Sequence, residues 1–185
     1  SKLHGSVDLQ WLPPSLFGFS VQKNRLKGSL NLTVLPSALE SLDASVNLFT
    51  GEITLTSLPK TMMCLNLAVN SFEGTLDLAN LPGTMKYIFL HENHFVGQVC
   101  LTRLPERIRG VHLSDNHLSG RIDIMCLPES LQELYLNKNC FKGVVDLSHL
   151  PDSLKILSLA DTEIEGEYQR KADGCLVFAT DSKIR

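Results

Sequence analysis

An asparagine recurs every 23 residues along this chain of 185 residues, and two other residue types keep the same interval. The asparagines are Asn24, Asn47, Asn70, Asn93, Asn116 and Asn139. The prolines are Pro13, Pro36, Pro59, Pro82, Pro105, Pro128 and Pro151, and the glycines are Gly5, Gly28, Gly51, Gly74, Gly97, Gly120, Gly143 and Gly166. Three columns with one period and no insertion do not arise by chance. A fixed period between about 20 and 50 residues is typical of repeat arrays, in which each unit packs on its neighbours.

The apolar positions of the repeat predict extended structure. From Leu39 the unit reads L-x-x-L-x-A-x-x-N-x-F-x-G-x-I-x-L-x-x-L-P. The residues before the asparagine alternate with period two, which is typical of a strand with one buried face. The segment after the asparagine also alternates, so we expect an extended return path. Because proline disfavours a helix just before it, only the P-x-[ST]-[LMI] stretch is expected to form a turn of 3₁₀-helix.

The position of the asparagine indicates a structural role. Where the chain bends away from the strand, backbone N–H and C=O groups turn inward without a sheet partner, and each one left unpaired costs about 1–3 kcal/mol. An inward-pointing asparagine offers a donor and an acceptor to its own turn and to the next repeat. The six asparagines are therefore predicted to form a ladder. The glycine four residues later is expected to allow a backbone angle or a close approach that a side chain would prevent.

The pattern L-x-x-L-x-L-x-x-N-x-[LF]-x-G-x-[ILV] resembles the leucine-rich repeat family, from Leu3 to about Tyr168. Its G-x-[ILV] continuation is similar to the plant-type subclass, in which a second short strand follows the first. The resemblance implies a leucine-rich repeat solenoid with a curved parallel β-sheet on its concave face, an extended or 3₁₀ convex side, and few or no long helices. It implies an architecture and not a chemistry, because the family shares a fold across many functions.

The repeat pattern suggests where the domain is divided. Residues 1–164 are predicted to be tandem 23-residue repeats, and they begin in mid-repeat, so we expect the sequence to be part of a longer chain. The pattern weakens at the other end, where Thr162 replaces the asparagine and no further Leu-Pro pair occurs. Residues 165–185 are therefore predicted to form a C-terminal cap, with a β-hairpin turning around Ala172–Gly174.

Charge and hydropathy limit the classes of partner. The net charge of −3 gives no basic footprint, which argues against nucleic acid. No apolar run approaches the roughly 18 residues of a membrane span. We expect a monomer with no cofactor.

The cysteines bear on the compartment. The five are scattered, and none are paired at a C-x-x-C spacing. Free thiols in a reducing, cytoplasmic compartment are the favoured interpretation, while the Asn31-Leu32-Thr33 glycosylation sequon leaves a cell-surface or secreted protein open.

A group of aromatic and polar residues is the candidate binding site. In the predicted sheet, the outward positions of the first three coils carry small residues, whereas the next three carry larger ones. The candidate residues are Tyr87, Phe89, His91, His112, Glu133, Tyr135 and Asn137. They are expected to lie within roughly 10–15 Å on neighbouring strands. Aromatic residues with polar tips are typical of binding hot spots, although aromatics are also favoured on any β-surface.

Two further columns carry residue types that can bind a metal ion or act as acids and bases. His94, His117, Cys140 and Glu163 share one column, but residues one strand spacing apart cannot all converge on a zinc ion at about 2.0–2.3 Å, so at most two could share one. Asp77, Asp123 and Asp146 share another column, together with Asn31, Thr54 and Cys100. Short polar residues at a turn commonly bond local backbone amides, and we expect capping rather than acid–base catalysis.

The sequence favours recognition over catalysis. It holds no G-x-S-x-G nucleophile motif and no phosphate-binding glycine loop, and the resemblance implies an open face without the closed pocket that catalysis usually needs. We therefore expect a non-catalytic module that binds a protein or peptide on its concave sheet. The alternative is a structural spacer whose repeats set the distance between other domains.

Overall fold

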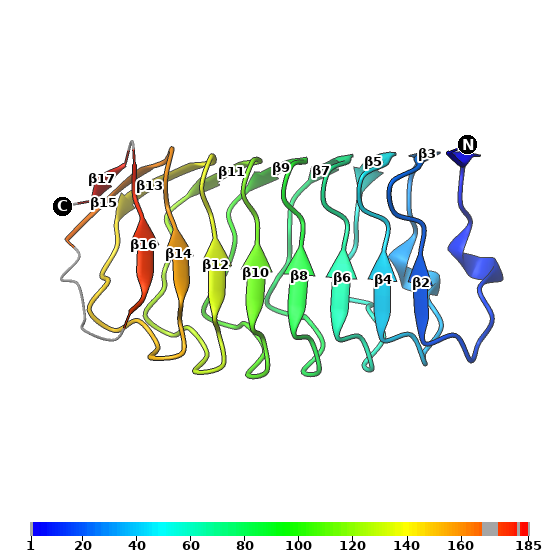
Figure 1. Ribbon diagram of the computed structural model, residues 1–185, viewed down its shortest axis with the longest axis horizontal. Coiled ribbons are helices and arrows are strands. Elements are labelled where there is room, and N and C mark those ends of the chain that lie inside the picture. Colours follow the sequence, from blue (N-terminus) through cyan, green and yellow to red (C-terminus); the bar gives the residue numbers. More distant parts are fainter. Residues whose placement is uncertain (1, 168–173, 181, 185) are drawn as a thin grey trace.

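The computed structural model describes residues 2–167, 174–180 and 182–184, and within them the chain winds into a row of coils carrying two sheets (Figure 1). The eight-stranded sheet contains β2 (Gly18–Ser20), β4 (Ser41–Asp43), β6 (Cys64–Asn66), β8 (Tyr87–Phe89), β10 (Gly110–His112), β12 (Glu133–Tyr135), β14 (Ile156–Ser158) and β16 (Leu176–Phe178). The nine-stranded sheet contains β1 (His4–Gly5), β3 (Arg25–Gly28), β5 (Leu48–Glu52), β7 (Ser71–Gly74), β9 (His94–Gly97), β11 (His117–Gly120), β13 (Cys140–Val144), β15 (Glu163–Gly166) and β17 (Lys183–Ile184). Consecutive coils supply neighbouring parallel strands, as in β8, β10 and β12.

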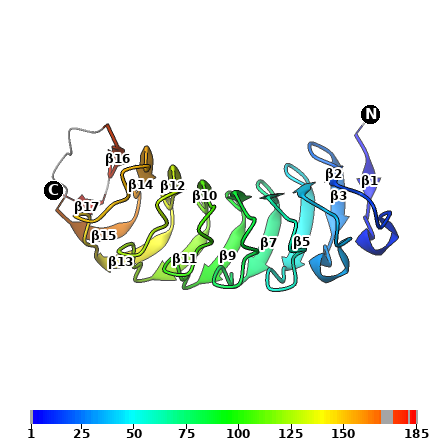
Figure 2. The same cartoon turned by 90° about the horizontal axis from the view of Figure 1, so that it is seen from below.

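The row of coils is curved. Figure 2 shows the eight-stranded sheet on the inner side of the curve and the nine-stranded sheet below it. The nine-stranded sheet is built from the residues that follow each asparagine, which confirms the predicted second strand. The predicted parallel solenoid without long helices is also confirmed, since the described helices are only two short 3₁₀ turns, η1 (Leu9–Trp11) and η2 (Leu32–Val34).

The core runs along the row as columns of identical positions. The side chains of Phe49, Phe72, Phe95 and Phe141 are all 0% exposed. Successive rings stack with centroids 6.1 Å apart between Phe49 and Phe72, and 6.4 Å apart between Phe72 and Phe95. Because burying one such side chain contributes about 1.5–3 kcal/mol, repetition in every coil makes this packing the main favourable contribution to folding.

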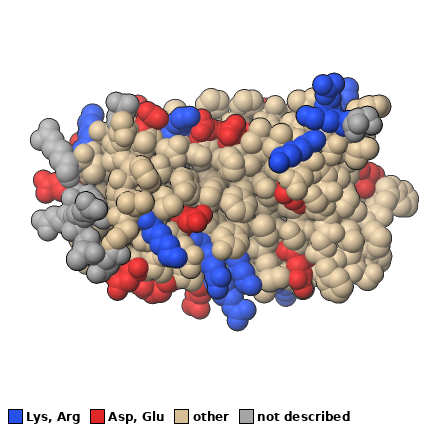
Figure 3. Space-filling view, viewed as in Figure 1, with Lys and Arg blue, Asp and Glu red and all other residues tan. Residues whose placement is uncertain are grey.

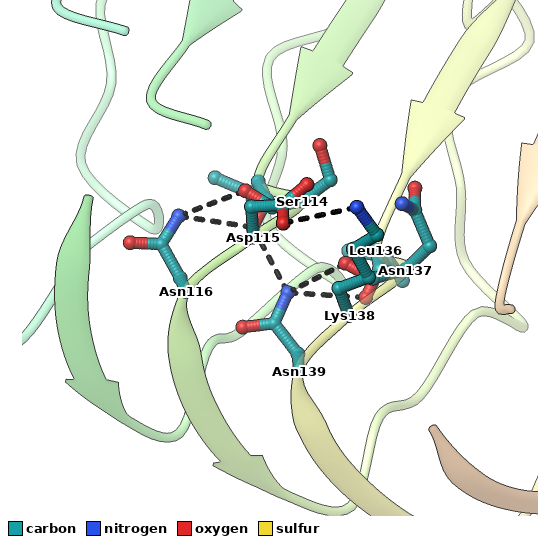
Figure 4. Close-up of polar contacts among 8 residues, drawn as sticks. Ser114, Asp115, Asn116, Leu136, Asn137, Lys138 and Asn139 are labelled. Atoms are coloured by element: carbon teal, nitrogen blue, oxygen red, sulfur yellow. Dashed lines mark hydrogen bonds and ion pairs between the residues drawn. The ribbon is translucent and has the colours of Figure 1, made fainter. Parts of the chain in front are cut away.

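The predicted asparagine ladder is confirmed, with one correction. The side-chain nitrogen of Asn116 donates to the Ser114 carbonyl of its own turn at 3.2 Å and to the Leu90 carbonyl at 3.1 Å. Its oxygen accepts from the N–H of Phe95 at 3.0 Å. Figure 4 shows Asn116 and Asn139 at equivalent positions beside their own turns. The second partner is the preceding coil, not the next one, because the unpaired groups that face each asparagine come from the turn before it.

A residue in the left-handed conformation precedes each asparagine of the ladder and also Thr162, and the repeat pattern did not predict it. These residues have φ between +52° and +57°. They are Lys23, Val46, Val69, Glu92, Asp115, Lys138 and Asp161. The expected conformational role of the repeat glycine is confirmed in the same way, because the glycines from Gly5 to Gly143 in this column have φ between +82° and +102°.

A column of hydroxyl groups joins the coils on the turns that lead into the eight-stranded sheet. The Thr84 hydroxyl donates to the carbonyls of Lys60 and Met62 in the preceding coil, at 2.7 and 2.8 Å. Equivalent bonds come from Thr61, Ser130 and Ser153. The P-x-[ST]-[LMI] stretch closes a single turn, with the Met85 N–H donating to Pro82 O at 2.9 Å. This i→i+3 bond is the single 3₁₀-type turn that was predicted, and the two longer 3₁₀-helices follow the side-chain caps at Asp8 and Asn31.

The described part of the C-terminal segment continues the two sheets, and the hairpin expected there stays a prediction. The hairpin turn was predicted around Ala172–Gly174, and residues 168–173 lie outside the described residues. Of the described strands, β16 pairs in parallel with β14, and β17 pairs in parallel with β15. The described part of residues 165–185 therefore continues both sheets, because Leu176 and Val177 supply the same alternation as the earlier coils.

Candidate binding face on the eight-stranded sheet

The structure brings the predicted aromatic residues together on the inner sheet. Phe89 on β8, His112 on β10 and Tyr135 on β12 are register partners in adjacent strands. The ring centroids of Phe89 and His112 lie 4.7 Å apart, and those of His112 and Tyr135 lie 4.5 Å apart. Tyr87 stands beside Phe89 on the same strand, with parallel rings 6.0 Å apart. These four rings and His91 are called the aromatic cluster below.

His112 is held at the centre of the aromatic cluster by a carboxylate. Its Nε2 lies 3.0 Å from Oε2 of Glu133 and donates to it, since a carboxylate only accepts. Burial lowers the pKa of His112, and the hydrogen bond and charge of Glu133 oppose that shift in part. The pair therefore places one fixed carboxylate beside the aromatic surface.

His91 lies on the same face with an unsatisfied polar atom. Its Nδ1 is buried without a hydrogen-bond partner in the described residues. The ring contacts Phe89 edge-on at 6.5 Å and lies 6.1 Å from the ring of His112. Burial lowers the pKa of His91, and the charges of Glu92 and Asp115 oppose this weakly. Both histidines of the aromatic cluster thus favour the neutral form.

Gly110 leaves room for the ring of Tyr87. This role of the glycine was not predicted from the sequence. A Cβ atom at Gly110 would come within 2.8 Å of Cδ1 of Tyr87 and 3.5 Å of Nε2 of His112. The φ of Gly110 is not positive, so the backbone does not require glycine here. Its absent side chain lets the Tyr87 ring lean across the neighbouring strand. The only available sequence signal was a glycine at an outward strand position.

The other predicted positions are placed differently. Asn137 follows β12 at the edge of the face, and its backbone carbonyl accepts from Asp115 N–H at 3.1 Å. No hydrogen bond joins its side chain to another part of the described chain. Ser45 and Ser158, on the coils of β4 and β14, are only 5% and 6% exposed. The hydroxyl of Ser45 donates to Oδ1 of Asp43 at 2.7 Å.

The face extends further than the sequence suggested. Leu176 and Phe178 on β16 are 51% and 49% exposed. Their register partners are Ile156 and Ser158 on β14, which places them on the same face as Tyr135. Because this segment was assigned to a cap, these two apolar residues were not considered as part of the site.

Charged residues border the face. Figure 3 shows charged side chains mainly along its two long edges, with a largely uncharged middle. Lys86, Arg109 and Lys155 precede β8, β10 and β14 at one edge. At the opposite edge, Asp115 forms an ion pair with Lys138 at 3.3 Å. A ligand on the aromatic cluster would therefore lie between two charged edges.

The histidine column and the aspartate column make contacts that are structural. His94 and His117 lie on the nine-stranded sheet, and their parallel rings stack with centroids 5.8 Å apart. The described residues contain no group of three or more side chains able to hold a metal ion. The predicted capping role of the aspartates is confirmed. Asp77 and Asp123 each accept from the N–H two residues later, at 3.0 Å, and Asp146 does so at 2.8 Å.

Cys64, Cys100, Cys126 and Cys140 are free thiols. Burial raises the pKa of the Cys64 thiol, which lies beside Tyr87 in the sheet. No helix in the described part of the chain is long and apolar enough to span a membrane.

Comparison with known proteins identifies the fold. No protein-family model matches the sequence, and no match was found among curated proteins. Similar solved structures include the Arabidopsis receptor kinase HAESA in complex with the peptide hormone IDA and the co-receptor SERK1 (27% identity, TM-score 0.65, 89% of this chain and 28% of that one). PEPR1–AtPEP1 is also similar (20% identity, TM-score 0.70, 99% and 31%), as is YopM from Yersinia enterocolitica (24% identity, TM-score 0.56, 94% and 44%).

These likenesses agree with the repeat itself. The 23-residue period, the inner parallel sheet and the asparagine ladder define a solenoid of the leucine-rich repeat type, and the chain shares this fold with the solved structures named above. It spans less than half the length of each solved chain named above.

Proposed function

We propose that this domain is a non-catalytic recognition module that binds an extended peptide or protein segment on its eight-stranded sheet. The contact residues are those of the aromatic cluster, with Glu133 and Asn137 beside it. The observation that carries the proposal is the contiguity of the cluster, in which the rings of Phe89, His112 and Tyr135 touch across three strands.

The physical argument rests on the surface that these rings offer. Tyrosine and phenylalanine provide large, rigid contact areas that lose little conformational entropy on binding. Tyr87, Phe89 and Tyr135 are only partly buried, so a ligand can still cover them. The backbone N–H and C=O groups of the sheet already bond to neighbouring strands, so a ligand does not need to pair with them. A ligand would therefore gain mostly from apolar burial, with Glu133 fixing a polar group.

The comparisons support the same class of partner. The solved structures of HAESA and PEPR1 are described as complexes, the first with a peptide hormone and a co-receptor and the second with AtPEP1. By extension, we propose that this chain also binds a protein or peptide partner, and that it does so without catalysis. Monomeric behaviour in solution is part of the same proposal.

Selection from a random-peptide display library tests the proposal. We expect the wild-type domain to enrich peptides that the Tyr87→Ala/Tyr135→Ala double variant does not bind. Ser20→Ala/Ser41→Ala is the matched control, since it changes the same number of outward residues on β2 and β4 of the same sheet. Circular dichroism would verify that both variants keep the fold.

The alternative function is a structural spacer. The even stacking of coils, with Asn116 tied to the coil before it, would also serve to hold other domains at a fixed distance. If the double variant retained the selected peptides with an intact fold, the aromatic cluster would not be the site, and the spacer would be favoured.

A further inference from the structure

An open hollow lies apart from the aromatic cluster, on the turns that lead into β6, β8 and β10. It has a volume of about 660 Å³, and its lining includes Lys60, Asn80, Gly83, Thr84 and Arg107. None of the aromatic cluster residues contributes to this lining. The hollow is therefore a separate feature of the surface, and its origin lies in two departures from the repeat.

The first departure is the loss of a hydroxyl group. The neighbouring coils place Thr84 and Ser130 at this position, and each donates to two carbonyls of the preceding coil. Arg107 occupies the same position in the coil between them. In the described chain no side chain donates to the carbonyls of Gly83 and Met85, which a hydroxyl at position 107 would reach. The arginine thus replaces an inter-coil contact.

The second departure is Gly83. The equivalent positions carry Pro14, Ser37 and Lys60 in the preceding coils, and Glu106, Glu129 and Asp152 in the following coils. A Cβ atom at Gly83 would meet no heavy atom within 4 Å, and the φ of this glycine is not positive. Neither packing nor backbone conformation therefore requires glycine. Its effect is to leave this part of the wall without the charged side chain that Lys60 and Glu106 carry at the equivalent positions.

The remaining charge at the hollow is positive. Lys60 and Arg107 are exposed and contribute two cations, and no carboxylate is in the lining. Neither cation forms an ion pair with any described residue. Outside the lining, the carboxylate of Asp77 accepts from the side-chain amide of Asn80 at 2.9 Å. Departures from local structural rules with no structural gain are typical of functional sites.

We propose that this hollow binds an oxyanion, a phosphate or sulfate group. The guanidinium of Arg107 presents parallel N–H donors that match two oxygens of such a group, and Lys60 adds a compact charge from the turn two coils before Arg107. Asn80 and the Thr84 turn supply the polar surroundings. This site is independent of the peptide-binding face, and either could exist without the other.

Titration with inorganic phosphate, followed by amide NMR at constant ionic strength and pH 7.5, tests the site. We expect saturable shifts of the Gly83 and Thr84 amides in the wild-type domain. Arg107→Gln should weaken phosphate binding at least about fivefold, as loss of one charge-assisted contact does. Arg109→Gln is the matched control, because Arg109 lies in the same coil but not in the lining, and it should bind phosphate as the wild type does.

Sodium sulfate, titrated in the same way, separates the two oxyanions. Tighter phosphate binding would assign the site to phosphate, and tighter sulfate binding would assign it to sulfate. Absence of saturable shifts with both ions, or equal shifts in Arg107→Gln, would overturn the proposal.

Arg107→Ser gives a second, opposite readout. The serine hydroxyl should restore the bonds to the carbonyls of Gly83 and Met85, and one such gain is expected to raise Tm by about 2–4 °C. The same variant should lose the phosphate-induced shifts. An unchanged or lower Tm would refute the argument that the arginine replaces a stabilising contact, and retained phosphate binding would refute its role as a ligand.

Discussion

Replacing Asn93 by alanine is the sharpest test of how the coils are held together. Asn93 is 4% exposed, and its side-chain oxygen accepts from Phe72 N–H at 3.0 Å. Its nitrogen donates to the carbonyls of Leu67, Leu90 and His91 at 3.1, 3.2 and 3.2 Å. The alanine would leave one buried N–H without an acceptor and three carbonyls without this donor.

The expected cost follows from those contacts. One unsatisfied buried group costs about 1–3 kcal/mol, and the shared carbonyls add to it, so we expect Asn93→Ala to destabilise the domain by about 2–4 kcal/mol. For a domain of this size each kcal/mol lowers Tm by about 2–4 °C. Thermal unfolding followed by circular dichroism would measure the difference.

Asn137, two coils further along the chain, provides a matched control. Asn137 is the same residue type, but its side chain makes no hydrogen bond in the described chain, so Asn137→Ala should change stability by less than about 0.5 kcal/mol. If Asn93→Ala and Asn137→Ala melted at the same temperature, the asparagine ladder would not stabilise the fold as argued.

Three further predictions follow from the structure. Val46→Asn should stabilise the domain by about 1 kcal/mol, measured by urea unfolding, because Val46 is β-branched at φ +55° and asparagine tolerates this conformation better. Gly110→Ala should leave Tm nearly unchanged but displace Tyr87, and calorimetry should show at least about fivefold weaker binding of a selected peptide. Stability should fall as pH is lowered from about 7 to 5.5, because the pKa values of His91 and His112 are depressed, so the folded state binds fewer protons than the unfolded state in this window. Urea unfolding of the His91→Phe/His112→Phe variant should show a flatter pH dependence, and an unchanged slope would contradict the assignment.

The sequence was informative wherever a position keeps one residue type in every coil. The asparagine and glycine columns predicted a ladder and a special backbone angle, and both are present. The left-handed residue before each asparagine was not predicted, because Lys23, Val46 and Asp115 share no chemistry that marks the position. Backbone geometry there is imposed by the coil and not by the side chain.

The candidate site was predictable in outline only. Spacing of two within a strand and of 23 between coils placed Phe89, His112 and Tyr135 together, and the structure does the same. Gly110 was missed because its effect depends on the lean of a neighbouring ring. Phe178 was missed because it lies only 20 residues after its register partner Ser158. Strand β16 therefore no longer follows the 23-residue repeat.

The central claim is that a peptide binds across strands β8, β10 and β12. Amide NMR of the wild-type domain, titrated with the tightest peptide from the library selection, locates the bound peptide directly. We expect the largest shifts at Phe89, His112 and Tyr135 and at their neighbours on the eight-stranded sheet. Shifts confined to β2 and β4, or to the nine-stranded sheet, would contradict the account.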